Sequence, residues 1–314
     1  MSKLQDRAVA GLARAALAVL RAVGPVAASN IGGAVARAIG PLLPVSRVAD
    51  ANLRLAMPEL DRAARRRIIA GVWDNLGRTA AEFPHVPALR RTEAGVGWEI
   101  VGEDIIRGLA ARGGPMILVS GHFGNWEVLP LAAAAFGVRM SSFYRPASNP
   151  LVDQIILDLR RAVVGDIPNF AKGAAGARAA MVHLRHGGPL GILVDQKLND
   201  GIAVPFFGHM AMTAPAAAAM ALRFGCPLIA ARVERLAPAR FRITVEPPLP
   251  LPDTGDRQAD IAALTTSVNA VLERWIRARP DHWLWLHRRW PKDAEAAATP
   301  PPAPAGASPG RTSR

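Results

Sequence analysis

The chain has 314 residues, half of them hydrophobic, which is enough to bury a substantial core and excludes a protein that is disordered throughout. Lys and Arg number 38 against 25 Asp and Glu, and the net charge of +13 predicts an anionic partner: nucleic acid, an anionic membrane, a phosphorylated lipid or an acidic carrier protein. The single cysteine, Cys226, excludes an internal disulfide and fits a buried thiol, which is compatible with a cytoplasmic setting.

The first helix expected from the sequence is amphipathic. Arg7, Arg14 and Arg21 recur every seven residues, which on a helix makes a basic stripe beside aliphatic residues. The longest uncharged run, 22–36, contains a proline and two adjacent glycines and is shorter than the roughly 20 apolar residues that span a bilayer. We therefore predict that residues 1–45 form a helical segment that associates with a membrane, with packing on its own domain as the alternative.

Residues 1 to about 90 are expected to be helical, and the pattern changes near residue 97. From there, short apolar or alternating runs alternate with helical stretches, which predicts an α/β fold: a mixed sheet sandwiched by helices, with a helical N-terminal region. The expected strands are 98–101, 116–120, 138–144, 190–194, 228–233 and 241–245. The expected helices are 103–112, 125–136, 149–163, 175–186, 213–224 and 257–278.

One α/β domain is expected over residues 46–292, after the N-terminal segment. Its last two strands are expected to pair as a hairpin across residues 235–240. Residues 293–314 are rich in Pro and Ala and lack apolar periodicity, which predicts a disordered tail.

The stretch from Gly121 to Glu127 is the most informative part of the chain, because it follows an apolar run that is typical of a buried strand. It puts His122 where a strand ends and a helix begins, with Asn125 as a good N-cap. Imidazole accepts a proton near neutral pH, and a carboxylate on its far nitrogen fixes the tautomer and stabilises the imidazolium. The motif predicts base chemistry by His122 and Glu127, with a capped turn whose histidine bonds a backbone carbonyl as the alternative.

The third and fourth expected strands also end in polar residues, Tyr144 and Arg145 after one and Asp195 and Gln196 after the other. Because the ends of neighbouring strands meet at one edge of an α/β layer, these side chains are expected to face the same crevice as His122. A guanidinium there suits a phosphate. For Arg145 the alternative is a surface arginine before a proline turn.

Aromatic residues make up only 5% of the chain, and two groups of them stand out. Phe206 and Phe207 are adjacent and are expected to line a channel for an aliphatic chain, with core packing as the alternative. Residues 280–290 hold three tryptophans and two arginines. That composition suits a lipid headgroup boundary or a stacked nucleobase, or a closing segment that pins the C-terminus onto the domain.

These motifs together closely resemble the late acyltransferases of lipid A biosynthesis, the lauroyl and myristoyl transferases of the lysophospholipid acyltransferase superfamily. The resemblance covers roughly residues 10–292. It rests on His122-Phe123-Gly124-Asn125-Trp126-Glu127, Tyr144-Arg145-Pro146, Asn149-Pro150, Asp195-Gln196, Phe206-Phe207-Gly208 and Trp283-x-Trp285-x-His287-Arg288-Arg289-Trp290. It also includes Asn52-Leu53, Met57-Pro58-Glu59 and Trp73-x-Asn75-x-Gly77-Arg78.

The resemblance implies a glycerolipid acyltransferase-like fold, a catalytic His122 and Glu127 pair, and an acyl carrier protein or acyl-CoA thioester as donor. The acceptor is then a phosphorylated glycolipid, and the enzyme attaches, peripherally or by an N-terminal anchor, to an anionic membrane surface, the cytoplasmic face of the inner membrane. Arg145 is expected to hold an acceptor phosphate or to aid the oxyanion. The other residues expected to bind substrate or shape the pocket are Asn125, Tyr144, Asp195, Gln196, Phe206 and Phe207.

The expected function is transfer of an acyl chain to a hydroxyl of a lipid A precursor. One alternative is another acceptor, a glycolipid or lysophospholipid such as a phosphatidylinositol mannoside. The other is a non-catalytic protein that binds membrane surfaces.

No cofactor, metal or nucleic acid is expected. The sequence lacks Gly-x-Gly-x-x-Gly, a Walker loop and His-Glu-x-x-His, and His183 and His186 are expected on a helix surface. The arginines are scattered through predicted helices, whereas a nucleic-acid-binding protein gathers them on one face. Gly-x-Ser-x-Gly is absent around Ser120, which disfavours a serine nucleophile.

Overall fold

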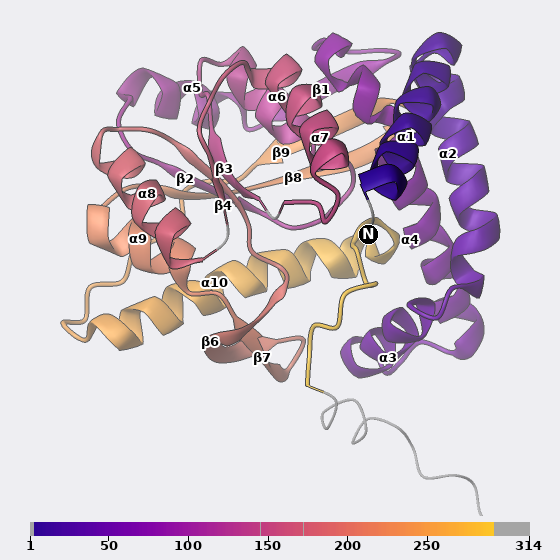
Figure 1. The fold of residues 1–314 in the computed structure, drawn as a ribbon. Coiled ribbons are helices and arrows are strands. Elements are labelled where there is room, and N and C mark those ends of the chain that lie inside the picture. Colours follow the sequence, from indigo (N-terminus) through magenta and orange to yellow (C-terminus); the bar gives the residue numbers. More distant parts are fainter. Residues whose placement is uncertain (1–2, 145, 172, 292–314) are drawn as a thin grey trace, which may run out of the picture.

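The computed structural model describes residues 3–144, 146–171 and 173–291, and in them the chain forms a seven-stranded sheet between layers of helices (Figure 1). The α/β class, the mixed sheet and the helical N-terminal region are confirmed. The expected tail over 293–314 lies outside the described residues.

The sheet has the strand order β1-β9-β8-β2-β5-β3-β4. Its paired strands run parallel except β8 and β9, which form the expected antiparallel hairpin. A separate hairpin, β6 and β7, stands apart from this sheet. The strands are β1 (Gly97–Val101), β2 (Ile117–Ser120), β3 (Ser141–Tyr144), β4 (Asn169–Ala171), β5 (Leu190–Leu193), β6 (Lys197–Phe206), β7 (His209–Thr213), β8 (Leu228–Ala237) and β9 (Arg240–Val245).

Helices cover both faces of the sheet (Figure 1). Ile117 and Val119 of β2 point into one core, with α8, α9 and α10, and Leu118 points into the other, with α5 and α6. A strand buried on both faces explains the unbroken apolar run in the sequence. The helices after β1 are α5 (Glu103–Arg112), α6 (Val128–Ala135), α7 (Pro150–Val164), α8 (Ala174–Arg185), α9 (Ala216–Phe224), α10 (Arg257–Ala278) and the 3₁₀ helix η3 (Pro280–His282).

Each expected strand and helix corresponds to an observed element, whereas β4, β6 and β7 are additional. The strand β4 has three residues, too few for a periodic signal. The strand β6 begins with Lys197, Leu198, Asn199 and Asp200, three of them polar, and pairs only with β7. Little of it is therefore buried, and its sequence lacks the alternation of a core strand.

The N-terminal region is a set of helices packed beside one end of the sheet (Figure 1). The helix α2 packs along α4 where Gly32 and Gly77 face each other, and a Cβ on Gly77 would lie 2.2 Å from the carbonyl oxygen of Gly32. The two glycines therefore let the helix backbones touch. These elements are α1 (Lys3–Val23), α2 (Pro25–Ile39), η1 (Gly40–Leu42), α3 (Ser46–Ala56), α4 (Arg62–Glu82) and η2 (Phe83–Ala88).

Replacing Gly77 with alanine is expected to destabilise the protein by about 1–3 kcal/mol, because the added methyl group forces α2 and α4 apart. Gly11→Ala in α1 is the matched control, since a Cβ there meets no atom within 4 Å. That change should be neutral or stabilise by about 0.5–1 kcal/mol through helix propensity. Urea unfolding of both variants checks the contrast, and equal effects would contradict the close crossing.

Candidate active site

The carboxyl ends of β2, β5 and β3 meet at one edge of the sheet, as expected for neighbouring parallel strands. Ser120 of β2 pairs in register with Leu193 of β5. Two residues beyond each of these, His122 and Asp195 emerge side by side, and Tyr144 ends the adjacent strand β3. The sheet edge thus gathers three of the residues predicted from the sequence.

His122 and Asp195 form the centre of the site. The ring Nδ1 of His122 lies 2.9 Å from Oδ1 of Asp195, and the backbone amide of His122 donates to Oδ2 at 2.8 Å. The histidine side chain is 19% exposed and the aspartate side chain 3%. With its hydrogen on Nδ1, the imidazole donates to the carboxylate and keeps the lone pair of Nε2 for accepting a proton.

The environment of Asp195 keeps its carboxylate ionised. Burial alone would raise the pKa of Asp195, but the charge of His122 and the hydrogen bonds from its ring, from its backbone amide and from Trp283 lower that pKa to about 2. The indole N–H of Trp283 donates to Oδ2 at 2.8 Å. Asp195 therefore accepts three hydrogen bonds and can hold the His122 ring in one tautomer.

Asp195 is expected to make the free energy of unfolding depend on pH in the acid range. Its pKa is lower in the folded protein, about 2, than its ordinary value of 3.8, so its stabilising contribution is complete above the ordinary value and is lost as the pH falls through the folded one. This contribution is on the order of 2 kcal/mol. Urea unfolding of the wild type and Asp195→Asn should give a difference that shrinks between about pH 4 and pH 2, and a constant difference would contradict the shift.

Glu127 faces a different partner from the one that the sequence predicts. Its carboxylate is held by Arg160 of α7, with Nη2 2.6 Å from Oε1 and Nε 3.2 Å from Oε2. The nitrogen of His122 predicted to bond Glu127 bonds Asp195 instead. The physical reason is position: Glu127 is the N-cap of α6 and its side chain reaches α7, whereas Asp195 follows β5, the strand that pairs with β2 ahead of His122.

Arg160 is a residue of this site that the sequence analysis did not single out. A signal was present, because Arg160 lies three residues after Leu157 and four before Val164 on α7, and both of these line the same cavity. Burial alone would lower the pKa of Arg160, but the hydrogen bond and charge of Glu127 raise it. The bidentate pair of Arg160 and Glu127 forms a charged part of the cavity wall.

A cavity of about 260 Å³ lies near the pair of His122 and Asp195; Trp126 lines it, whereas His122 and Asp195 do not. Apolar side chains from β2, β3, β5, α6 and α7 form most of its wall. The ring of His122 packs edge-on against Trp126, at 5.0 Å between centroids, and Trp126 lines the cavity. Its polar lining includes Ser120, Glu127, Tyr144 and Arg160. A base near a mostly apolar cavity suits a reaction on a substrate that carries an aliphatic chain.

The other predicted polar residues have separate positions. Tyr144 lines the cavity, and Arg145 lies outside the described residues. Gln196 is half-buried and does not line the cavity. Asn125 is fully buried, and its amide donates to Glu82 at 2.8 Å, so this side chain supports the loop from inside the fold.

Phe206 and Phe207 lie in the core and not in the cavity wall, so their placement matches the core-packing alternative. They pack against tryptophans of the closing segment: Phe206 stacks on Trp290 at 5.6 Å, and Phe207 lies 6.1 Å from Trp285. The prediction of an acyl channel is wrong because, in the sequence, two adjacent phenylalanines suit a channel for an aliphatic chain and a packed core equally well.

The closing segment, residues 280–290, holds the loop that follows β2. The backbone amide of Leu284 donates to the carbonyl of His122 at 3.0 Å, and Phe123 forms an isolated bridge with Trp283. Because Trp283 also donates to Asp195, one indole fixes the carboxylate while its backbone fixes the loop. This function of the segment accords with the packing alternative for its tryptophans.

Within the residues that the structure describes, no group of three or more His, Cys, Asp or Glu side chains is placed to hold a metal ion. His183 bonds the carbonyl of Pro189 through Nε2 at 3.2 Å and contacts the ring of Phe170. The expectation of chemistry without a metal stays a prediction.

Comparison with known proteins gives one family. The model of the bacterial lipid A biosynthesis acyltransferases matches residues 3–292. The lipid A biosynthesis lauroyltransferase of Escherichia coli K12 is 25% identical over 266 residues, 78% of each chain. The lipid A biosynthesis palmitoleoyltransferase of the same organism is 24% identical over 253 residues, 77% of this chain and 78% of its own length. A lipid A biosynthesis acyltransferase of Shigella flexneri is equally similar, with 24% identity over 253 residues.

Proposed function

Since this chain belongs to the family of bacterial lipid A biosynthesis acyltransferases, and is therefore an acyltransferase, we propose that it transfers a fatty acyl chain to a hydroxyl of a lipid A precursor. The donor is a thioester of acyl carrier protein or of CoA. The observation that carries the proposal is the pair of His122 and Asp195, whose histidine ring contacts Trp126 in the wall of an apolar cavity.

The reaction is direct transfer with His122 as the general base. Nε2 of His122 takes the proton of the acceptor hydroxyl while that oxygen attacks the thioester carbonyl carbon. The new ester C–O bond forms, the C–S bond breaks, and the imidazolium returns the proton to the thiolate that leaves. Asp195 orients the ring and stabilises its charge through the bond at Nδ1.

The remaining groups bind and orient the substrates. The cavity takes the acyl chain of the donor, and the pair of Arg160 and Glu127 lies on its wall. Arg145 holds a phosphate of the acceptor or aids the oxyanion, and Tyr144 shapes the entrance. One thioester is consumed and one thiol is released for each acyl chain transferred.

The experiment that tests this function measures thioester consumption by purified protein. Acyl carrier protein loaded with a panel of chain lengths is mixed with a lipid A precursor, with a phosphatidylinositol mannoside, with a lysophospholipid, or with no acceptor. Consumption that depends on the lipid A precursor is expected. If the thioester is consumed only with one of the other acceptors, that acceptor replaces the lipid A precursor in the proposal. If no thioester is consumed with any acceptor, a non-catalytic membrane-binding protein is the better description.

We also propose that residues 1–45 attach the protein to the cytoplasmic face of the inner membrane as a peripheral segment. Support comes from exposure: eleven of the eighteen exposed large apolar side chains among the described residues lie before residue 44. Leu12 of α1 is 73% exposed and Leu42 of η1 is 82% exposed. No single described helix meets the length and hydropathy required to cross a bilayer, whereas the segments Pro25–Leu42 and Ser46–Ala56, bent by 83°, meet them jointly.

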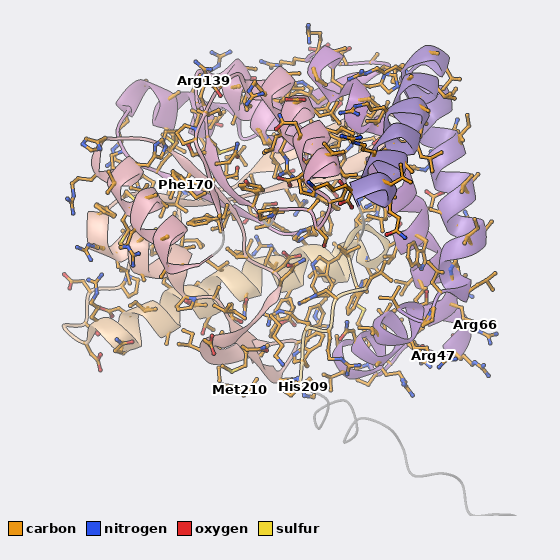
Figure 2. All side chains as sticks on the ribbon, in the orientation of Figure 1. Arg47, Arg66, Arg139, Phe170, His209 and Met210 are labelled. Carbon is orange, nitrogen blue, oxygen red and sulfur yellow. The ribbon has the colours of Figure 1, made fainter. Side chains whose placement is uncertain are left out.

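Arginine side chains lie beside the exposed Leu42 and Leu43 of this region. Arg47 and Arg66 lie on the outer surface at the α3 end of the molecule (Figure 2), and with Arg62 they line a surface hollow beside Leu42. Exposed leucines flanked by arginines complement a bilayer with anionic headgroups, because the leucines enter the apolar layer while the guanidinium groups meet phosphates.

Changing Arg47, Arg62 and Arg66 together to glutamine is expected to weaken binding to anionic vesicles by roughly 100-fold, since each cation near such a surface contributes about 1 kcal/mol. The matched control removes three exposed arginines at the opposite end of the molecule, Arg178, Arg185 and Arg223. Vesicle sedimentation at low and high salt measures both. Binding of the wild type should weaken with salt, and equal losses in the two triple variants would contradict the proposed surface.

A further inference from the structure

Three side chains on one face of α4 meet the catalytic loop from inside the fold. Asn75, Thr79 and Glu82 are spaced by four and three residues, which aligns them along the helix. All three are buried, with exposures of 7%, 4% and 1%. They lie beneath the segment from His122 to Glu127, and no step of the proposed reaction uses them.

The carbonyl of Gly124 is held by two of them. It accepts from the amide of Asn75 at 3.0 Å and from the hydroxyl of Thr79 at 3.2 Å. Gly124 has a positive φ of 59°, and a Cβ there would lie 1.8 Å from the carbonyl oxygen of Val233. The loop thus makes its tight turn at Gly124 against a neighbouring strand, and α4 fixes the orientation of that turn.

The third side chain holds the next residue of the loop. Glu82 accepts from Asn125 at 2.8 Å, from Ser29 of α2 at 2.6 Å and from the backbone amide of Ala239 at 3.1 Å. Its charge is balanced by the buried Arg235, which forms an ion pair with Glu82. Arg235 also donates to Asn75 at 3.2 Å and to Thr79 at 3.1 Å, so one guanidinium orients all three side chains.

We propose that Asn75, Thr79 and Glu82 are positioning residues that hold the loop carrying His122 and Glu127, so that His122 stays against Asp195 and Glu127 stays in the cavity wall. The proposal rests on the acyl transfer proposed above. It accounts for Asn75 in the motif Trp73-x-Asn75-x-Gly77-Arg78, which the chemistry of the site leaves without a function. It also makes the N-terminal helices part of the catalytic apparatus, because Ser29 of α2 bonds the same carboxylate that bonds the loop.

The test uses Thr79, because removing Glu82 would leave the buried charge of Arg235 unpaired and destabilise the fold. Thr79→Val keeps the shape of the side chain and removes the hydroxyl that bonds Gly124, and Thr79→Ser keeps the hydroxyl as the matched control. We expect Thr79→Val to lower kcat at least about fivefold, with the donor KM changed less than about twofold. Thr79→Ser should stay within about twofold of the wild type.

A second variant, Asn125→Ala, removes the bond to Glu82 and no exposed group. It should lower kcat with KM nearly unchanged, whereas a raised KM would assign Asn125 to substrate binding and overturn the role of Glu82. Hydrogen exchange of residues 121–127, read by mass spectrometry without substrate, should rise in Asn125→Ala and Thr79→Val. This readout separates the two proposals: an inactive wild type would contradict the acyl transfer, and unchanged loop exchange in folded variants would contradict the positioning.

Discussion

Replacing His122 with alanine is expected to lower turnover by roughly 10²- to 10⁴-fold, the usual contribution of a general base. The fold should persist, because the ring lies at a sheet edge and is partly exposed. The ring bond to Asp195 and the ring contact with Trp126 are lost, while the backbone amide of residue 122 still donates to that carboxylate.

The control for this variant is His186→Ala, which removes an exposed imidazole at the end of α8. Both proteins are assayed for thioester consumption and for their thermal unfolding midpoint. A folded His122→Ala protein with undiminished turnover would remove His122 from the mechanism. A loss shared by His186→Ala would show that the assay responds to something other than the site.

The second large effect is expected for Asp195→Asn, with a loss of turnover on the order of 10²- to 10⁴-fold. Asp195 receives only donors: the ring and backbone amide of His122 and the indole of Trp283. An asparagine has one acceptor oxygen, and its amide donates, so it favours the tautomer of His122 that carries the hydrogen on Nε2. That tautomer cannot accept the proton of an incoming hydroxyl.

The tautomer can be read without substrate from the ¹⁵N shifts of the His122 ring. We expect hydrogen on Nδ1 in the wild type and in Glu127→Gln, because Glu127 bonds Arg160 and not the ring. Asp195→Asn should shift the hydrogen toward Nε2. A tautomer that changes in Glu127→Gln and not in Asp195→Asn would restore the pairing that the sequence predicts.

Much of the fold follows from local patterns in the chain. The strands from β1 to β9 that join the main sheet, except β4, have apolar or alternating runs, and the helices between them have clear periodicity. The hairpin of β6 and β7 lacks such a pattern because β6 starts with mostly polar residues and pairs with one neighbour only. Its pairing depends on contacts that a local window of sequence does not contain.

The candidate site was also predictable only in part from local sequence patterns. His122 was found because a histidine between a strand and a helix stands out locally, and Asp195 was assigned to the same crevice from the ends of neighbouring strands. The carboxylate that bonds the ring was predicted to be Glu127, because Glu127 is near His122 in the sequence. In the structure it is Asp195, which is 73 residues from His122 and bonds it directly because their strands are neighbours. The ion pair of Glu127 and Arg160 likewise joins residues 33 positions apart: the helical spacing of Arg160 places it with cavity residues, but no local pattern indicates that it pairs with Glu127.

The buried residues that hold the loop in place were the hardest to predict from the sequence. Glu82 and Arg235 are separated by 153 residues, and each in isolation has the sequence appearance of an exposed charge on a helix or a strand. The packing of α4 against β8 brings them together, and there Glu82 bonds Asn125 of the loop while Arg235 balances the charge of Glu82. The same holds for Phe206 and Phe207, where a local motif fits a channel and a core equally well and tertiary packing decides for the core.

The most direct measurement is mass spectrometry of a lipid A precursor incubated with acyl carrier thioester and either the wild-type protein or His122→Ala. The account predicts that the wild type adds the mass of one acyl chain, as an ester, to the precursor, and that His122→Ala adds almost none in the same time. A precursor of unchanged mass with the wild type, or an equal increment with folded His122→Ala, would contradict acyl transfer by this histidine.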